Sequence, residues 1–276
     1  APTEIGLYSI VVATQNDDPN DPNYIINNPD GNDLIIVYFK DYGEDLPLYH
    51  VGNYTDLSYI GIYSDPNPVY NFLGPNRIVS SYLQVSNFEI GNEFQPVYGD
   101  FKGSYNGNNF EIYLRDQDAI HTSGIFGIFE SVQGVIRNLG IKLDTVIIDN
   151  AMTAGFLAAQ ADGAEISHVY AIGEFIISGE NSNIGGLIGH TIRQTIVQNC
   201  YTDIAISNKG NQLSGNVGGL IGLMDDTALK FSYSLGAMEA YYIQAHELNI
   251  GQIGGSILSI MDGQNTLYGN KFLARN

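Results

Sequence analysis

The sequence predicts an all-β protein built as a parallel β-helix, or β-solenoid, of about five coils. A glycine-rich apolar segment recurs about every 30 residues, and a second β-patterned segment follows each copy at a similar distance. A unit of this length matches one solenoid coil, because successive coils stack and bury a continuous core. The general preference of parallel crossovers for the right hand makes this a right-handed β-helix.

The glycine-rich segments define the repeat. They read GIFGIF, AGFLAA, IGGLIGH, VGGLIGL and IGGSIL. The glycine before the apolar pair recurs at Gly124, Gly155, Gly186, Gly219 and Gly255. The intervals between these glycines are 31, 31, 33 and 36 residues. Glycine weakens a strand unless a bend or a close backbone neighbour needs the missing side chain, so we expect these glycines to shape the coil.

The second segments give an independent register. One column holds Ile136, Ile166, Val197, Leu229 and Leu267. The same alignment stacks Tyr170, Tyr201 and Tyr233, and it sets Leu139, Val169, Cys200 and Ser232 side by side. Cys200 is the single cysteine, which excludes an internal disulfide. We expect it to face inward as a small hydrophobe.

Residues 1–90 differ in composition from residues 91–276 and are predicted to form a smaller N-terminal all-β domain before the solenoid. The segments IGLYSIVVAT (5–14) and DLIIVYFKDY (33–42) are rich in β-branched and aromatic residues and are bounded by turn formers. A sandwich-like, immunoglobulin-type domain is one arrangement that this pattern allows.

Charge narrows the range of partners. The 276 residues include 30 acidic and 11 basic side chains, which gives a formal net charge of −19. Such a surface repels a phosphate backbone, so no nucleic-acid partner is expected. No stretch approaches the roughly 18 apolar residues of a membrane span, so no membrane insertion is expected. The start at Ala1 is consistent with removal of a signal peptide, and we expect a secreted, extracellular or cell-surface protein.

Four segments carry a family resemblance: FKGSYNGNNFEI (101–112), SGIFGIFESVQGVIRNLGIKL (123–143), IGGLIGHTIRQTIVQNCYTDIAIS (184–207) and VGGLIGLM (217–224). They resemble the GLUG-motif repeats of bacterial and archaeal surface proteins. The resemblance covers roughly residues 99–260 and implies an extracellular β-solenoid of the kind found in adhesins. It supplies no catalytic residues. The pattern departs from the family at AGFLAAQADG, which lacks the second glycine, and decays at IGGSILSIMDG.

An acidic segment near the N-terminus is the candidate metal site. Its carboxylates are Asp17, Asp18, Asp21, Asp30 and Asp33. With neighbouring asparagines they offer the oxygen ligands that Ca²⁺ prefers, although the spacing is not that of an EF-hand. The alternative is a solvated loop in which Asp and Asn favour turns.

An enzymatic role is the less favoured alternative. Some β-helices are polysaccharide lyases or hydrolases, and hydrolases need two carboxylates across a cleft. The nearest pair here, Asp225 and Asp226, follows an apolar strand and is more typical of a solvated turn. We therefore expect a protein without catalytic residues.

The remaining hypothesis is an extracellular structural protein, either a self-assembling subunit of a surface filament or an adhesive module. Its partners would be further copies of itself, as a homopolymer, or surface glycans and proteins. A monomeric polysaccharide-binding stalk is the alternative, with Tyr98, Tyr105 and Tyr113 as candidates for stacking on sugars. Assembly would use strand edges at both ends of the chain. The candidate assembly residues are Ile5, Leu7, Ile10, Val12, Leu267 and Phe272.

Overall fold

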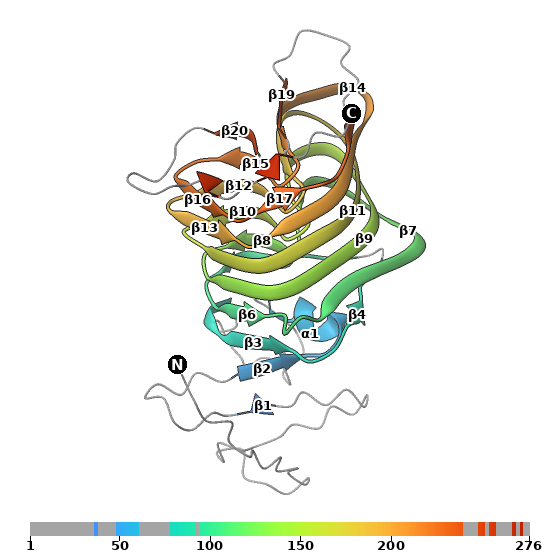
Figure 1. Ribbon diagram of the computed structural model, residues 1–276. Coiled ribbons are helices and arrows are strands. Elements are labelled where there is room, and N and C mark those ends of the chain that lie inside the picture. Colours follow the sequence, from blue (N-terminus) through green and yellow to red (C-terminus); the bar gives the residue numbers. More distant parts are fainter. Residues whose placement is uncertain are drawn as a thin grey trace, which may run out of the picture.

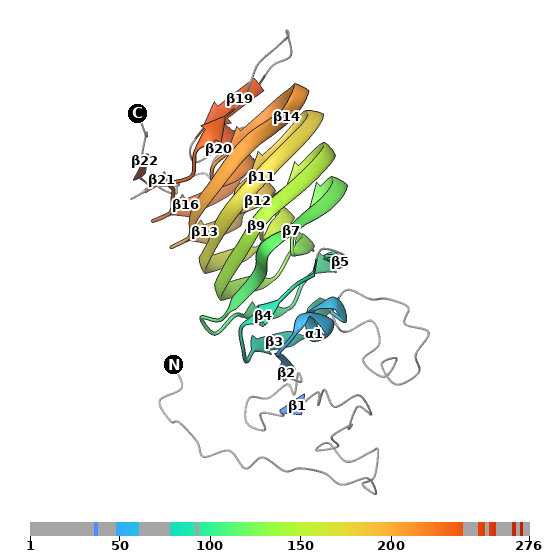
Figure 2. The ribbon, with the colours of Figure 1, turned by 90° about the vertical axis from the view of Figure 1, so that its right-hand side faces the viewer.

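The computed structural model describes residues 36–37, 48–60, 78–91, 94–239, 248–251, 254–257, 267–268 and 271–272. Over these residues the chain is nearly all β, and its strands form one sixteen-stranded and one six-stranded sheet. Successive coils lie on top of one another, as Figures 1 and 2 show. The predicted parallel β-solenoid of about five coils is confirmed.

The six-stranded sheet is parallel throughout and takes one short strand from each coil. Its strands are, in spatial order, β5 (Val97–Phe101), β8 (Phe129–Val132), β10 (Ala158–Asp162), β12 (Ile188–Ile192), β15 (Ile221–Met224) and β20 (Gly254–Ile257).

The larger sheet follows one path of strands from the N-terminal to the C-terminal end of the stack. That path is β1 (Ile36–Val37), β2 (Leu48–Val51), β3 (Ser81–Gln84), β6 (Ser104–Asn106), β9 (Val135–Ala154), β11 (Glu165–Gly185), β13 (Thr195–Gln198), β16 (Thr227–Lys230) and β21 (Leu267–Tyr268). Strands beside the path are β4 (Phe88–Glu89), β7 (Glu111–Phe126), β14 (Tyr201–Gly218), β17 (Tyr233–Ser234), β18 (Met238–Glu239), β19 (Leu248–Gly251) and β22 (Lys271–Phe272). Apart from the antiparallel pair β1–β2, the recorded pairings are parallel.

Four successive coils turn one corner through a residue with positive φ. Asn138, His168, Asn199 and Phe231 have φ values of 57°, 54°, 54° and 49°. They are in register, because their neighbours pair from coil to coil. Asparagine tolerates this left-handed conformation well, whereas a bulky residue such as Phe231 adopts it at a cost. Tertiary stacking therefore sets the corner even where the residue type does not favour it.

The core is aromatic in the early coils and more aliphatic later. Phe126, Phe156 and Phe175 are buried together, and the rings of Phe156 and Phe175 lie 4.5 Å apart at 82°. One core column of the small sheet runs Phe129, Ala158, Ile188 and Ile221. Such variation fills a continuous core with side chains of different volume.

The predicted columns of the second segments are confirmed, including the inward position of Cys200. The predicted glycine column is confirmed between Gly186 and Gly219, and its other steps are wrong. Phe126 pairs with Ala154, so Gly124 lies three residues out of register with Gly155. The pairs Phe129–Ala158–Ile188–Ile221–Gly254 give coil lengths of 29, 30, 33 and 33 residues.

The glycines do not give one register, because the coil requires glycine at several different positions. Some of these glycines have close backbone neighbours, and others have a positive φ. Gly124 has a positive φ of 77°, and a Cβ on Gly127, three residues later in the same coil, would lie 2.6 Å from the Ala159 nitrogen. Glycine is thus required at more than one place in each coil, and its recurrence does not fix a single register.

The described part of residues 1–90 joins the solenoid sheet. β2 pairs in parallel with β3, and β3 pairs in parallel with β6. β4, at residues 88–89, pairs with β7 across the predicted boundary at residue 90. These strands are therefore extensions of the stack. A separate N-terminal domain stays a prediction for the residues outside the described ranges.

Candidate functional site

A column of three tyrosines runs along the outside of the larger sheet. Tyr170, Tyr201 and Tyr233 occupy equivalent positions on β11, β14 and β17, as the sequence predicts. Adjacent ring centroids lie 5.2 and 5.3 Å apart, and adjacent planes differ by 7°. This spacing is close to the roughly 4.8 Å between neighbouring strands. The rings cover one another, so the column offers hydroxyl groups and ring edges to a ligand.

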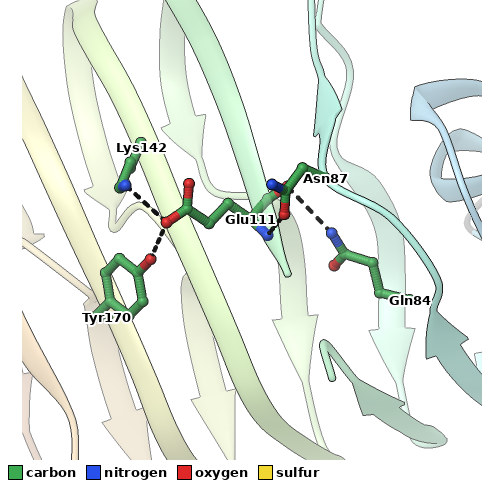
Figure 3. Close-up of polar contacts among 5 residues, drawn as sticks. All are labelled: Gln84, Asn87, Glu111, Lys142 and Tyr170. Atoms are coloured by element: carbon green, nitrogen blue, oxygen red, sulfur yellow. Dashed lines mark hydrogen bonds and ion pairs between the residues drawn. The ribbon is translucent and has the colours of Figure 1, made fainter. Parts of the chain in front are cut away.

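Glu111, the first residue of β7, ends this column (Figure 3). Its Oε1 accepts a hydrogen bond from the Tyr170 hydroxyl and forms an ion pair with Lys142 Nζ at 2.7 Å. These two contacts hold the pKa of Glu111 below its usual value, with the Lys142 hydrogen bond as the largest cause. Burial and the hydrogen bond to Glu111 raise the pKa of Tyr170. Glu111 is therefore charged and Tyr170 protonated at neutral pH.

The backbone of Glu111 connects this surface cluster to the core. Its N–H donates to Asn87 Oδ1 at 2.8 Å, and its carbonyl accepts from Gln84 Nε2 at 3.2 Å (Figure 3). Gln84 Oε1 also accepts from the hydroxyl of Tyr105, which is fully buried. These contacts link Glu111 to β3, β9 and β11, so the cluster fastens successive coils together.

Gly140 explains how Tyr170 reaches Glu111 across an intervening coil. It lies between these two residues in the register. A Cβ on Gly140 would lie 2.6 Å from both Cζ and the hydroxyl oxygen of Tyr170. The missing side chain leaves the space that the tyrosine ring occupies.

An open pocket of about 460 Å³ lies against three strands of the six-stranded sheet. One wall is formed by residues of β5, β8 and β10, and the other by Ile125 and Thr153 near the ends of β7 and β9. Ile78 and Lys102 complete the lining. The strand residues that line it are Gly99, Asp100, Glu130, Ser131, Ala159 and Gln160.

The polar groups of this pocket differ in how they are held. Glu130 Oε2 accepts a hydrogen bond from the Gly99 N–H at 2.8 Å, which fixes that carboxylate. Ser131 Oγ is buried, and no residue in the described ranges provides it with a hydrogen-bond partner. Asp100 pairs with Ser131 in register, and Ser131 pairs with Gln160. Three successive coils thus each contribute one polar side chain to the same line.

The predicted calcium ligands Asp17, Asp18, Asp21, Asp30 and Asp33 lie outside the described residues, and calcium binding stays a prediction. Among the residues that are described, no three His, Cys, Asp or Glu side chains gather as metal ligands would. The assembly candidates Ile5, Leu7, Ile10 and Val12 also fall outside these ranges.

Leu267 and Phe272 lie in β21 and β22 near the C-terminal end of the larger sheet. β21 pairs with β16, and β22 pairs with β17. Within the described ranges these two strands have no further partner. Their placement is consistent with an edge, and their role in assembly stays a prediction.

The structure also places the cysteine, the paired aspartates and one of the tyrosines that the sequence analysis considered. Burial raises the pKa of the Cys200 thiol to about 12, which disfavours the reactive thiolate. Asp225 and Asp226 form the turn between β15 and β16, as expected. Tyr105 was a candidate for sugar stacking, but that interpretation is wrong because its ring is buried in the core.

Sequence reasoning missed the pocket. Asp100, Ser131 and Gln160 differ in type and lie in poorly matching segments of the repeat. The available signal was their constant place, directly before the inward residues Phe101, Val132 and Ala161 of each coil. This shared position is visible only in the correct register of the six-stranded sheet, and the predicted glycine column does not give that register.

Comparisons with known proteins add little. No protein-family model matches this chain, and no curated protein matches it. A solved structure described as a "putative immunoglobulin A1 protease" from Bacteroides ovatus is similar, with 14% sequence identity and a TM-score of 0.40. The match covers 83% of this chain and 79% of that one. The short helix α1 (Tyr54–Ser58) and the rest of the described chain include no helix able to span a membrane.

Proposed function

We propose that this chain is an extracellular structural protein that serves as an adhesive module of a cell surface. In this role the solenoid is a stiff support, and its outer residues hold surface glycans or proteins. The module has no catalytic residues of its own. The fold, the outer columns and the net charge of −19 support this proposal together.

The observation that carries the proposal is the alignment of outward side chains in straight columns. The rings of Tyr170, Tyr201 and Tyr233 repeat at 5.2 and 5.3 Å. The pocket side chains Asp100, Ser131 and Gln160 are paired in register and repeat at the spacing of the strands. A surface that repeats at regular intervals suits a partner that also repeats, such as a polysaccharide. The aromatic core beneath keeps these columns in place.

Binding and the absence of turnover can be tested in one assay. The purified chain is applied to immobilised neutral and acidic polysaccharides, and retained protein is measured together with any released sugar. Retention without released products is expected. Release of shortened or unsaturated sugars would contradict the proposal and favour the lyase or hydrolase alternative.

A filament subunit is the second candidate. The specific observation in its favour is the position of β21 and β22 at the C-terminal edge, because an edge strand presents backbone donors and acceptors to another chain. Light scattering and negative-stain electron microscopy, with and without millimolar Ca²⁺, separate the two candidates. Regular filaments would favour the subunit, and stable monomers would favour the adhesive module.

A further inference from the structure

The pocket beside the six-stranded sheet has the dimensions of a ligand site. Its volume of about 460 Å³ falls within the range of roughly 300–1,000 Å³ found for small-molecule sites. It crosses β5, β8 and β10, which are successive strands of one parallel sheet. A ligand in it would therefore lie along the axis of the solenoid and contact three coils.

The polar side chains of the pocket are spaced for a ligand with repeating hydroxyl groups. Asp100, Ser131 and Gln160 are neighbours in register, so each lies about one strand spacing, roughly 4.8 Å, from the next. One sugar unit of an extended chain is of similar length. A carboxylate, a hydroxyl and an amide together accept and donate the hydrogen bonds that sugar hydroxyls require.

None of these three side chains is held by a described residue. Ser131 Oγ is buried and has no hydrogen-bond partner within the described part of the chain, a state that costs free energy until a partner arrives. The side chains of Asp100 and Gln160 likewise have no recorded partner among the described residues, in contrast to Glu130, which is held by the Gly99 N–H. A bound hydroxyl group would satisfy Ser131 once the Ser131 side chain turns toward the pocket.

The opposite wall supplies apolar contact. Ile125 is 44% exposed although it is a large aliphatic residue, and it lines the pocket beside Thr153. Aliphatic side chains pack against the C–H face of a sugar ring and exclude water from it. The pocket thus combines a polar wall with an apolar wall.

The charged side chains of the pocket lining favour neutral sugars over acidic ones. The lining holds the carboxylates of Asp100 and Glu130 against the single cation of Lys102, on a chain with a net charge of −19. A uronic acid or another anionic sugar would be repelled. We propose that this pocket binds a neutral oligosaccharide, with Asp100, Ser131 and Gln160 bonding its hydroxyl groups and Ile125 packing on a ring. This assignment rests on the adhesive function proposed above.

The test uses the complete chain and calorimetric titration with defined probes. The neutral probes are hexasaccharides of glucose, mannose and galactose, and the acidic probe is a hexasaccharide of galacturonic acid. Two pocket variants are compared with the wild-type chain: Asp100→Ala and Ser131→Ala. Glu165→Ala is the matched control, because Glu165 is an exposed carboxylate on the larger sheet, away from the pocket lining.

The two pocket variants should fold normally. Asp100 is exposed, and Ser131→Ala removes a hydroxyl that no described residue satisfies, so melting temperatures should stay within about 2 °C of wild type. Asp100→Ala should weaken binding of the best neutral probe about tenfold or more, and Ser131→Ala about three- to tenfold. Glu165→Ala should leave the affinity unchanged.

The other outcomes would contradict the pocket assignment, the ligand class or glycan adhesion. If a neutral probe binds and neither pocket variant weakens it, the pocket assignment is wrong and the adhesive function remains. If the acidic probe binds more tightly than every neutral one, the ligand class is wrong. If no glycan binds here or in the polysaccharide screen, the pocket assignment fails together with glycan adhesion, and protein adhesion becomes the remaining form of that function.

Discussion

The interior of the solenoid and the tyrosine column on its outside are built by the same repeat but follow different rules. Inside, one column changes from Phe129 to Ala158 to Ile188, whereas the outer column keeps tyrosine at three successive positions. The core needs only to be filled, and neighbouring side chains compensate for each change of volume. The outer column depends on tyrosine at each position, because each ring stacks on the ring of the next coil. The core therefore supplies most of the stability, and the column supplies alignment between coils.

The largest expected effect comes from emptying the core. Phe156→Ala removes a fully buried ring that packs against Phe175 at 4.5 Å. The free energy of unfolding should fall by about 3–5 kcal/mol. Chemical denaturation followed by circular dichroism measures this loss. Met152→Ala is the control, because Met152 is 61% exposed and should change stability by less than about 0.5 kcal/mol. Equal effects of the two variants would show that the core assignment is wrong.

Filling the gap that Tyr170 crosses should have the next largest effect. In Gly140→Ala the new Cβ would meet the end of the Tyr170 ring at 2.6 Å, so the ring must move away from Glu111. We expect a loss of about 1–3 kcal/mol. Gly91→Ala is the matched control, since a Cβ there has no atom within 4 Å. Comparable unfolding curves for Gly140→Ala and wild type would contradict the packing described here.

Tyr170→Phe separates stacking from hydrogen bonding. The ring and its contact with Tyr201 at 5.2 Å remain, but the hydroxyl that donates to Glu111 is lost. We expect about 1 kcal/mol lower stability at neutral pH. Because the folded pKa of Tyr170 is raised, its contribution is present below the usual value of 10.0 and declines as the pH rises above it. The difference between wild type and variant should therefore shrink in alkali, as denaturation at several pH values would reveal.

The smallest expected effect concerns Glu111 in acid. Its folded pKa is lowered, so its contribution to stability is present above the usual value of 4.5 and is lost as the pH falls through the folded pKa. Glu111→Gln should cost only about 0.5 kcal/mol at neutral pH, since Lys142 is 44% exposed and the ion pair is screened. Melting curves between about pH 6 and about pH 3 should converge for the two proteins. A constant difference across this range would contradict the ion pair.

The same contrast explains what the sequence could predict. The tyrosine column and the Ile136–Ile166–Val197–Leu229 column were predictable, because large residues of one kind recur at one position of the second segment. The glycine column was not, because close backbone contacts require glycine at several places per coil. The links of Glu111 to Lys142 and Tyr170 depend on parallel register across two coils. The pocket side chains share a position but no residue type, so composition alone could not reveal them.

We propose that the outer columns of this solenoid bind a glycan without chemically changing it. The most direct measurement applies the complete chain to an array of neutral and acidic glycans and analyses the glycans by mass spectrometry afterwards. We expect the chain to be retained on neutral glycans, and we expect the masses of these glycans to be unchanged. Shortened or unsaturated glycans would contradict the proposal, as would failure to retain any glycan of the array.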